Sequence, residues 1–380
     1  MKRNKLLFIL VGVYLLLGFS SCSNDDKSVF GDDFEIPELT DANTIQFTVD
    51  VTGEWKLLQI VGSGGRMAVD WGDGRLQKIE STEANPVVHY KYGNSKIYQV
   101  RIWAEELSFC SLGGEIPPVR DLRLGYLPKM TELHLNSFLS TPELDLSASC
   151  PNLERINIGN WADLERIDLS QCPKLQAMDI YTNPKLTLLK FGQLPALRSL
   201  KCYFNDALSS LSLKGATNLN DVQCGSNPKL STIEADSRME VRQLGISGCA
   251  FQTLGFLSSF PSLTTLDCSS NQLTVLDASP LLRLQSLDCS GNMNLTHLQI
   301  PSQDLTNPIL RTLDCSFCHL DEDELNTLFD MLTAVPESQP GYPSGYGITF
   351  NGNLGAENCD WKVVEEKGWG IFIKPEFLIN

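Results

Sequence analysis

The feature that most constrains this chain is a period of 22 residues in its apolar positions. Nine residues mark the period, at intervals of 22 in five consecutive cases and of 21 to 26 elsewhere: Leu133, Ile156, Met178, Leu200, Val222, Leu244, Leu266, Leu287 and Leu313. A turn of this length cannot bury a core alone, so stability must come from stacking neighbouring turns over one shared apolar column. The period therefore predicts an extended array of nine turns.

Each of the nine turns is expected to carry a short strand. A second apolar or thiol residue follows each marker by two positions: Leu135, Ile158, Ile180, Cys202, Cys224, Ile246, Cys268, Cys289 and Cys315. With Leu, Met or Val three residues upstream of the markers, this gives the L-x-x-L-x-[L/C] strand pattern. Residues 119–320 thus resemble the leucine-rich repeat family, and the resemblance implies a solenoid with a sheet on its concave face.

Two further columns support this interpretation. Two turns carry Cys249 and Cys318 at the position of the family's conserved-type Asn. Five turns carry Asn there: Asn183, Asn205, Asn227, Asn271 and Asn292. We expect this Asn to satisfy backbone groups where the chain leaves the strand. A second apolar pair, offset by about 11 residues, recurs along the array, for example Leu144 and Leu146. The back of each turn should therefore be short and extended, with no room for a long helix.

The N-terminus is typical of an exported lipoprotein. Residues 1–21 combine Lys2, Arg3 and Lys5 with an apolar run and small residues directly before Cys22. They resemble a bacterial lipoprotein signal, which implies lipid attachment, such as palmitate, at Cys22; an ordinary signal peptide is the alternative. Residues 23 to 26, which end in two aspartates, resemble an acidic tag that directs lipoproteins to the outer face of the outer membrane. Residues 22–42 are polar enough to form a flexible tether.

Residues 43–108 alternate apolar and polar side chains as strands do. The W-G-D-G stretch from 71 to 74 and the His-Tyr-Lys-Tyr-Gly stretch from 89 to 93 resemble the PKD-like β-sandwich family, whose members carry a W-G-D-G turn and an H-x-Y segment. The resemblance implies a small sandwich in which Asp70 and Asp73 could bind a cation. Turn-forming carboxylates bonded to the local backbone are the simpler interpretation of both residues.

Residues 321–380 are expected to cap the open end of the array. The segment from Asp321 to Leu332 predicts an amphipathic helix with acids in its first turn. The tail resembles the terminal element of bacterial leucine-rich lipoproteins, with Asp360 as an N-cap and Gly368 past a helix end. The expected fold is mainly β: a leucine-rich repeat solenoid preceded by a small β-sandwich and followed by short capping helices.

Composition argues against several classes of function. A formal charge of −16 is unsuited to binding nucleic acid or anionic lipid. The twelve cysteines fall mainly at inward repeat positions, so we favour free thiols used in packing over disulfides or zinc ligands. The four histidines have no nucleophile in register, and no phosphate loop or hydrolase motif occurs. We therefore expect neither enzymatic activity nor a cofactor.

What remains is the outward surface of the repeated strands. The candidate ligand-binding residues on the predicted concave face are Arg155, Trp161, Asp179, Tyr181, Arg198, Lys201, Tyr203, Asp267, Asp288 and Asp314. Three of these, Asp267, Asp288 and Asp314, should stack about 5 Å apart and repel one another, which a cation or a basic partner would relieve. Soluble side chains on a wet sheet are the simpler explanation.

The leading functional hypothesis is a surface-anchored protein that recognises or adheres to another protein. Capture of glycans for nutrient uptake is the alternative, with Tyr181, Tyr203 and Trp161 as an aromatic platform. A purely structural role in the envelope is the third hypothesis. The step from fold to function rests on analogy with leucine-rich repeat surface proteins.

Overall fold

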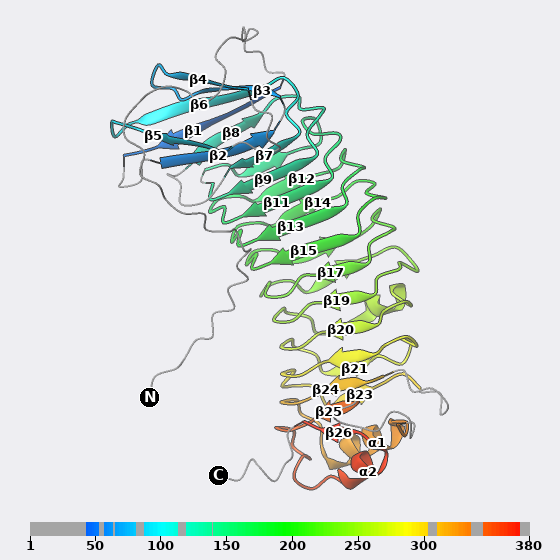
Figure 1. Ribbon diagram of the computed structural model, residues 1–380. Coiled ribbons are helices and arrows are strands. Elements are labelled where there is room, and N and C mark those ends of the chain that lie inside the picture. The colour runs from blue at the N-terminus through cyan, green and yellow to red at the C-terminus, as the bar shows by residue number, and fades with distance from the viewer. Residues whose placement is uncertain are drawn as a thin grey trace.

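The computed structural model describes residues 43–52, 57–63, 65–80, 87–112, 119–138, 140–302, 310–335 and 345–372. The stack of turns follows an arc, with strands gathered at the N-terminal end and two helices at the C-terminal end (Figure 1). The signal, Cys22 and the tether of the sequence analysis lie outside the described residues. No helix in the described part is long and apolar enough to cross a membrane.

One 14-stranded sheet runs along the inner side of the arc (Figure 1). From β7 to β26 its neighbouring strands pair in parallel. These strands are β7 (Phe109–Leu112), β9 (Glu132–Asn136), β11 (Arg155–Gly159), β13 (Ala177–Tyr181), β15 (Ser199–Tyr203), β17 (Asp221–Gln223), β19 (Gln243–Gly245), β20 (Thr265–Asp267), β22 (Ser286–Asp288), β24 (Thr312–Asp314), β25 (Gly347–Thr349) and β26 (Gly370–Ile371).

The register confirms the predicted solenoid. Ile156 pairs with Leu133 on one side and with Met178 on the other, and the same offset continues to Leu313. All nine predicted markers are buried in one core. The array is also longer than predicted, because Cys110 and Ile348 occupy the marker position in β7 and β25.

The back of the solenoid carries short strands in three small sheets, as the second apolar column predicts. The strands are β10 (Glu143–Asp145), β12 (Arg166–Asp168), β14 (Leu188–Lys190), β16 (Ser210–Ser212), β18 (Thr232–Glu234), β21 (Val275–Asp277) and β23 (His297–Gln299). A 3₁₀ helix at Gly255–Ser259 takes this place in one turn. Each strand has three residues, so the back face is convex and discontinuous.

A buried asparagine ladder joins the turns behind the main sheet. The Asn227 side chain donates to the carbonyls of Cys202 and Cys224 at 2.7 Å each, and accepts from the backbone N–H of Asn205 at 2.8 Å. Cys249 replaces Asn in the turn after Asn227. Its thiol donates to the carbonyl of Cys224 at 3.3 Å. The column therefore satisfies buried carbonyls that the parallel strands leave unpaired.

The N-terminal strands fall into two sheets. A five-stranded sheet has the order β4-β3-β6-β1-β8 and comprises β1 (Thr44–Asp50), β3 (Arg66–Asp70), β4 (Leu76–Glu80), β6 (Ile97–Ala104) and β8 (Val119–Leu124). The other two strands, β2 (Leu57–Ser63) and β5 (Val87–Lys91), extend the solenoid sheet: β2 pairs antiparallel with β7, and β5 pairs antiparallel with β2. Both regions share one hydrophobic core.

The predicted boundary between 108 and 119 does not separate two sets of strands. β7 lies between the two predicted bounds, before the predicted start of the solenoid, yet pairs in parallel with the solenoid strand β9. β8 begins at residue 119, the predicted start of the solenoid, yet pairs antiparallel with β1. The two segments cross over, so the N-terminal strands cap the first turn through continuous hydrogen bonding.

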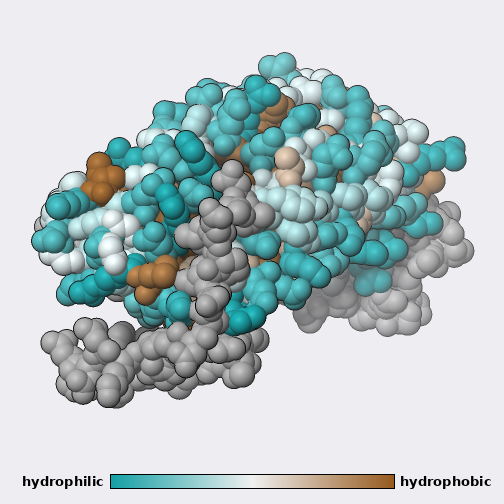
Figure 2. Space-filling view, turned by 90° about the horizontal axis from the view of Figure 1, so that it is seen from above, coloured by the Kyte–Doolittle hydropathy of each residue, from teal (hydrophilic) through white to brown (hydrophobic). Residues whose placement is uncertain are grey.

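The surface of this end is mainly hydrophilic. Leu76, Val87 and Ile97 are exposed apolar residues of β4, β5 and β6. Seen from above, apolar side chains form small, separate patches among hydrophilic ones (Figure 2). Isolated apolar residues of this kind are normal on a protein surface and indicate no binding site by themselves.

The eleven described cysteines are all buried and free. Burial raises the pKa of the Cys110 and Cys150 thiols to about 12, so both stay protonated. Those on the main sheet, such as Cys202 and Cys268, point into the core in place of Leu or Ile. Their packing role agrees with the sequence interpretation.

Two helices close the C-terminal end. The first, α1 (Glu322–Met331), begins at Asp321, whose side chain accepts from the N–H of Glu324 at 2.9 Å, and this confirms the predicted helix. The second, α2 (Lys362–Glu366), has Trp361 at its N-cap, so the prediction of Asp360 as the cap is wrong by one residue. Gly368 follows its end with a φ of +81°, as expected of a helix-terminating glycine.

The ladder predicts a graded loss of stability. Asn227→Ala should lower the free energy of unfolding by about 2–4 kcal/mol, because it leaves several buried backbone groups unpaired. Asn227→Cys should lower the free energy of unfolding by less, because a thiol at this position can donate to a carbonyl as Cys249 does. Chemical denaturation followed by circular dichroism measures both. Asn218→Ala is the control, because Asn218 makes one exposed bond to Pro195; equal losses in all three variants would contradict the ladder's role.

Candidate functional site: the concave face

The outward side chains of the main sheet form the concave face. On each strand the residue between the two inward ones points outward, which gives a central column along the solenoid. Its members are His134, Asn157, Asp179, Lys201, Gln223, Gly245, Asp267, Asp288 and Asp314. All of these except Gly245 are partly or largely accessible to solvent. The column is therefore a continuous surface whose chemistry changes from turn to turn.

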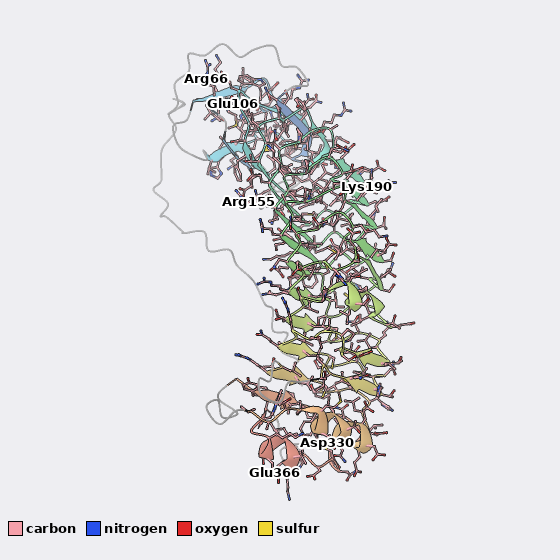
Figure 3. All side chains as sticks on the ribbon, turned by 90° about the vertical axis from the view of Figure 1, so that its right-hand side faces the viewer. Arg66, Glu106, Arg155, Lys190, Asp330 and Glu366 are labelled. Atoms are coloured by element: carbon pink, nitrogen blue, oxygen red, sulfur yellow. The ribbon has the colours of Figure 1, made fainter. Side chains whose placement is uncertain are left out.

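Near the N-terminal end the charges of this face are neutralised internally. Glu132 lies between two partners, 2.8 Å from the guanidinium of Arg155 and 2.9 Å from the imidazole of His134. Arg155 is exposed and lies on the opposite side of the solenoid from Lys190 (Figure 3). Arg155 is thus on the predicted face, but its charge is already paired.

The prediction that Trp161 lies on the concave face is wrong. Its side chain is 1% exposed, its indole N–H donates to the carbonyl of Leu135 at 3.0 Å, and its ring stacks on Phe138 at 4.7 Å. Trp161 and Phe138 take the position that Asn183 takes in the next turn. They begin the asparagine column with a buried aromatic pair, and the predicted three-ring platform loses one ring.

Tyr181 lies flat on the sheet. Its hydroxyl donates to the Asn136 side chain at 2.7 Å, two strands away. The ring crosses Gly159 on the intervening strand, where an added Cβ would lie only 2.3 Å from the tyrosine Cζ. Gly159 is thus required by close approach, and the half-buried ring is held in one orientation.

Tyr203 and Phe204 adjoin Tyr181 on the next turn. Burial raises the pKa of Tyr203 to about 12, so its hydroxyl remains a neutral donor. Phe204 is 57% exposed and lies 6.4 Å from the Tyr203 ring centre. Phe204 is not among the residues that the sequence predicts for this face.

Phe204 also has a strained backbone, with φ of +57°. Ten turns share a left-handed residue four positions after the marker, and most use Ser, Asn, Thr or Gly: Ser137, Asn160, Thr182, Phe204, Ser226, Gly248, Ser270, Gly291, Phe317 and Gly352. A bulky residue there costs about 1–2 kcal/mol. Phe317 rests its ring on Gly352.

Three exposed cations lie on this face, two on the same turn as Tyr203 and one two turns further on. Arg198 and Lys201 are exposed on the turn of β15, and Arg242 is exposed on the turn of β19. Asp179 lies half-buried beside them, and burial raises its pKa although Lys201 opposes the change. The structure thus brings five of the predicted residues together on two adjacent turns: Asp179, Tyr181, Arg198, Lys201 and Tyr203. We call these five residues and Phe204 the central patch.

The acidic column is in register as predicted. Asp267 pairs with Asp288, and Asp288 pairs with Asp314, on neighbouring strands. Each carboxylate also accepts from the hydroxyl of the serine two residues later, at 2.6–2.7 Å. No group of three potential metal ligands occurs among the residues described, so the cation hypothesis finds no preformed site here. The serine bonds agree with the simpler explanation of a hydrated sheet surface.

Asp70 and Asp73 are likewise occupied by local bonds. Asp70 accepts from the backbone N–H of Gly72 at 2.9 Å. Asp73 accepts from the backbone N–H of Arg75 at 3.1 Å and from the Tyr90 hydroxyl at 2.5 Å. These are the bonds of a turn stapled to the neighbouring strand. The arrangement favours the turn-forming interpretation over the cation site.

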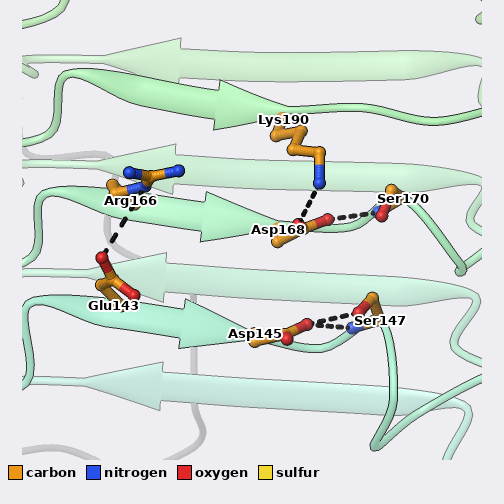
Figure 4. A network of polar contacts seen from close by, with 7 residues as sticks. All are labelled: Glu143, Asp145, Ser147, Arg166, Asp168, Ser170 and Lys190. Carbon is orange, nitrogen blue, oxygen red and sulfur yellow. Dashed lines mark hydrogen bonds and ion pairs between the residues drawn. The ribbon is translucent and has the colours of Figure 1, made fainter.

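The convex face carries its charges differently. Lys190 contacts Asp168 at 2.6 Å and Arg166 contacts Glu143 at 3.8 Å, in each case on the preceding turn (Figure 4). The back strands therefore pair cations with carboxylates of neighbouring turns. The central patch lacks this pattern.

The acidic column predicts a pH-dependent stability. Burial, and to a lesser degree Asp267 and Asp314, raise the pKa of Asp288. The folded state then binds more protons than the unfolded state above the ordinary carboxyl pKa, so stability falls as pH rises through the window up to the raised pKa. At neutral pH, Asp288→Asn should raise the free energy of unfolding by about 0.5 kcal/mol relative to the effect of Asp277→Asn.

Asp277→Asn is a matched control, because Asp277 accepts the same backbone bond from Ser279 but stacks on Gln299 rather than on a carboxylate. The difference between the two variants should vanish at a pH where carboxyls are protonated. Denaturant unfolding at both pH values measures it. An advantage that persists at low pH would contradict the electrostatic cause.

No family model matches the sequence, and no curated protein matches it either. Among solved structures, the leucine-rich repeat domain of APL1B is similar at 20% identity and a TM-score of 0.40, over 60% of this chain and 63% of that chain. The TLR13–ssRNA13 complex is similar at 18% identity and a TM-score of 0.37, over 65% of this chain and 41% of that chain.

The functional domain of InlJ from Listeria monocytogenes, whose description includes a cysteine ladder, is similar at 19% identity and a TM-score of 0.30, over 59% of this chain and 60% of that chain. The chain spans less than two thirds of each of these three structures. Likeness at this level does not extend to what these proteins bind. The chain is a solenoid of about 22-residue turns, and its structural neighbours are leucine-rich repeat proteins.

Proposed function

We propose that this chain is a surface-anchored, non-enzymatic protein that recognises another protein through the central patch. The observation that carries the proposal is the gathering of two tyrosines, an exposed phenylalanine and two exposed cations on the adjacent turns β13 and β15. Tyr and Arg are enriched at the centres of protein interfaces, where few side chains supply most of the binding energy. The patch has the composition of such a centre.

Rigidity supports the proposal. Tyr181 is held by Asn136 and Gly159, and its strand is bonded along its length to both neighbours. A side chain fixed before binding loses little conformational entropy when a partner arrives. Phe204 points the same way. Its left-handed backbone is shared by the other turns, but a bulky side chain at this position adds a cost that the fold does not require, and such strain often accompanies functional positions.

Anchoring is the part of the proposal that rests on sequence alone. Cys22 would carry the lipid, residues 23–42 would span the distance to the outer membrane surface, and the N-terminal strands would hold the solenoid away from it. The adhesive role follows from this placement, since a face held away from the membrane can reach a neighbouring cell or host protein.

Loss of the aromatic residues should abolish recognition. The double variant Tyr203→Ala/Phe204→Ser should weaken binding of a captured surface protein at least roughly thirtyfold, as expected for removal of about 2 kcal/mol of interface energy. Binding isotherms with the purified chain measure the effect. Phe204→Ser alone should raise the melting temperature by relieving strain.

The matched control is Leu188→Ser, which removes an exposed apolar residue from β14 on the convex face. It should leave binding unchanged. Equal affinity for the double variant and the unmodified chain would sink the proposal, as would a loss of equal size in the control.

Glycan capture is a second candidate function, favoured by the flat orientation of Tyr181. A ring fixed parallel to the sheet over Gly159 offers one face to a sugar, and its hydroxyl is already satisfied by Asn136. Tyr181→Ala/Tyr203→Ala should then lose retention on a glycan array, whereas Tyr181→Phe should keep it because the ring remains. Unchanged retention in the double variant would eliminate glycan capture.

A further inference from the structure

The two faces of the solenoid differ in how their cations are satisfied. On the convex face Arg166, Lys190 and Lys214 each lie within 4.0 Å of a carboxylate on a neighbouring turn. On the concave face, no ion pair within the described ranges involves Arg198, Lys201 or Arg242, and all three are exposed. In a chain with a formal charge of −16, unpaired cations grouped on one surface are unexpected.

The three cations form a compact group. Arg198 and Arg242 occupy the same register position, linked through Asn220, whose N–H donates to Arg198 and whose carbonyl accepts from Arg242. They are two strand spacings apart, which is about 10 Å. Lys201 lies on the same turn as Arg198, in the central column.

Nearby carboxylates have other partners. Asp221 on the intervening strand accepts from Ser199 at 3.3 Å and from the Gln223 amide at 2.8 Å. Asp179 is half-buried, and burial keeps its pKa above the ordinary value. Asp179 attracts Lys201 at longer range, but within the described ranges neither carboxylate forms an ion pair with the three cations, so the exposed cations can pair with anionic groups from outside.

From this contrast we infer that the concave face docks a short acidic segment of a partner protein, whose carboxylates pair with Arg198, Lys201 and Arg242. The inference rests on the proposed recognition function and names the chemistry of the partner. Tyr203 and Phe204 border the cations on one side and supply an apolar contact for a neighbouring side chain of the same segment.

The length of the segment is limited by the next turn. Asp267 on β20 directly follows β19 in the sheet, and Asp288 and Asp314 continue the negative charge beyond it. An anionic stretch running along the solenoid meets repulsion past Arg242, so about three or four extended residues fit, at roughly 3.3 Å each. A long polyanion, such as RNA or a sulfated polysaccharide, would overlap the acidic column.

The test uses the full chain and two labelled peptides, one with a Tyr-Glu-Glu-Glu core and one with a Tyr-Gln-Gln-Gln core. Saturation-transfer NMR and fluorescence anisotropy measure their binding at low and high salt. The Glu peptide should bind roughly tenfold more tightly than the Gln peptide at low salt, and the difference should shrink as salt screens the charges.

Two triple variants with the same change in net charge locate the site. R198Q/K201Q/R242Q should abolish the preference for the Glu peptide, and R166Q/K190Q/K214Q on the convex face should retain it. Equal binding of the two peptides to the unmodified chain would overturn the inference, and so would equal losses in both triple variants. Tighter binding of an oligouridylate or a sulfated oligosaccharide through the same three cations would overturn the assignment to a peptide.

The outcomes separate this inference from the proposed function. If R198Q/K201Q/R242Q still binds the captured surface protein while Tyr203→Ala/Phe204→Ser does not, recognition stands and the acidic partner falls. If the aromatic variant also binds normally, the recognition function falls as well.

Discussion

The whole structure depends on the in-register stacking of turns that are too small to fold alone. Each turn contributes one inward pair of apolar side chains to the main sheet, and that pair is covered only by its neighbours. A slip of one residue would point the pair at solvent, so burial fixes the register of every strand. Both open ends must then be closed, which the N-terminal strands do by hydrogen bonding and α1 does by packing.

Parallel stacking also creates a demand for buried hydrogen bonds at the corner behind each strand. Asn227 meets this demand with one amide, which reaches carbonyls of two successive turns. Cys249 and Cys318 each meet part of this demand, because each thiol donates at 3.3 Å to a backbone carbonyl of the preceding turn. The same demand explains why cysteine is frequent in this chain without forming disulfides among the residues described: its size suits the core and its weak donor suits the corner.

The period allowed the solenoid strands and their register to be predicted, because marker residues such as Met178 repeat at fixed intervals. The N-terminal crossover could not be predicted, since the antiparallel pairing of β8 with β1 joins residues distant in sequence. Trp161 was misplaced because it was judged by its proximity to the tyrosines, although its offset from Ile156 puts it in the asparagine column. The same offsets place Phe204 in the left-handed column, where a phenylalanine among Ser, Asn and Gly is the signal for an exceptional residue.

Because inward positions alone determine the fold, outward positions can differ between faces without changing the register. On the convex face the strands are short, and ion pairs such as Lys190 with Asp168 bridge neighbouring turns at little energetic gain. On the concave face Lys201 forgoes such a pair at almost no cost, since an exposed charge is solvated. A strained residue such as Phe204 costs more, but the contacts of its own turn with both neighbours can offset about 1–2 kcal/mol. The fold can therefore hold unpaired cations and an exposed aromatic side by side, ready for a partner that satisfies both.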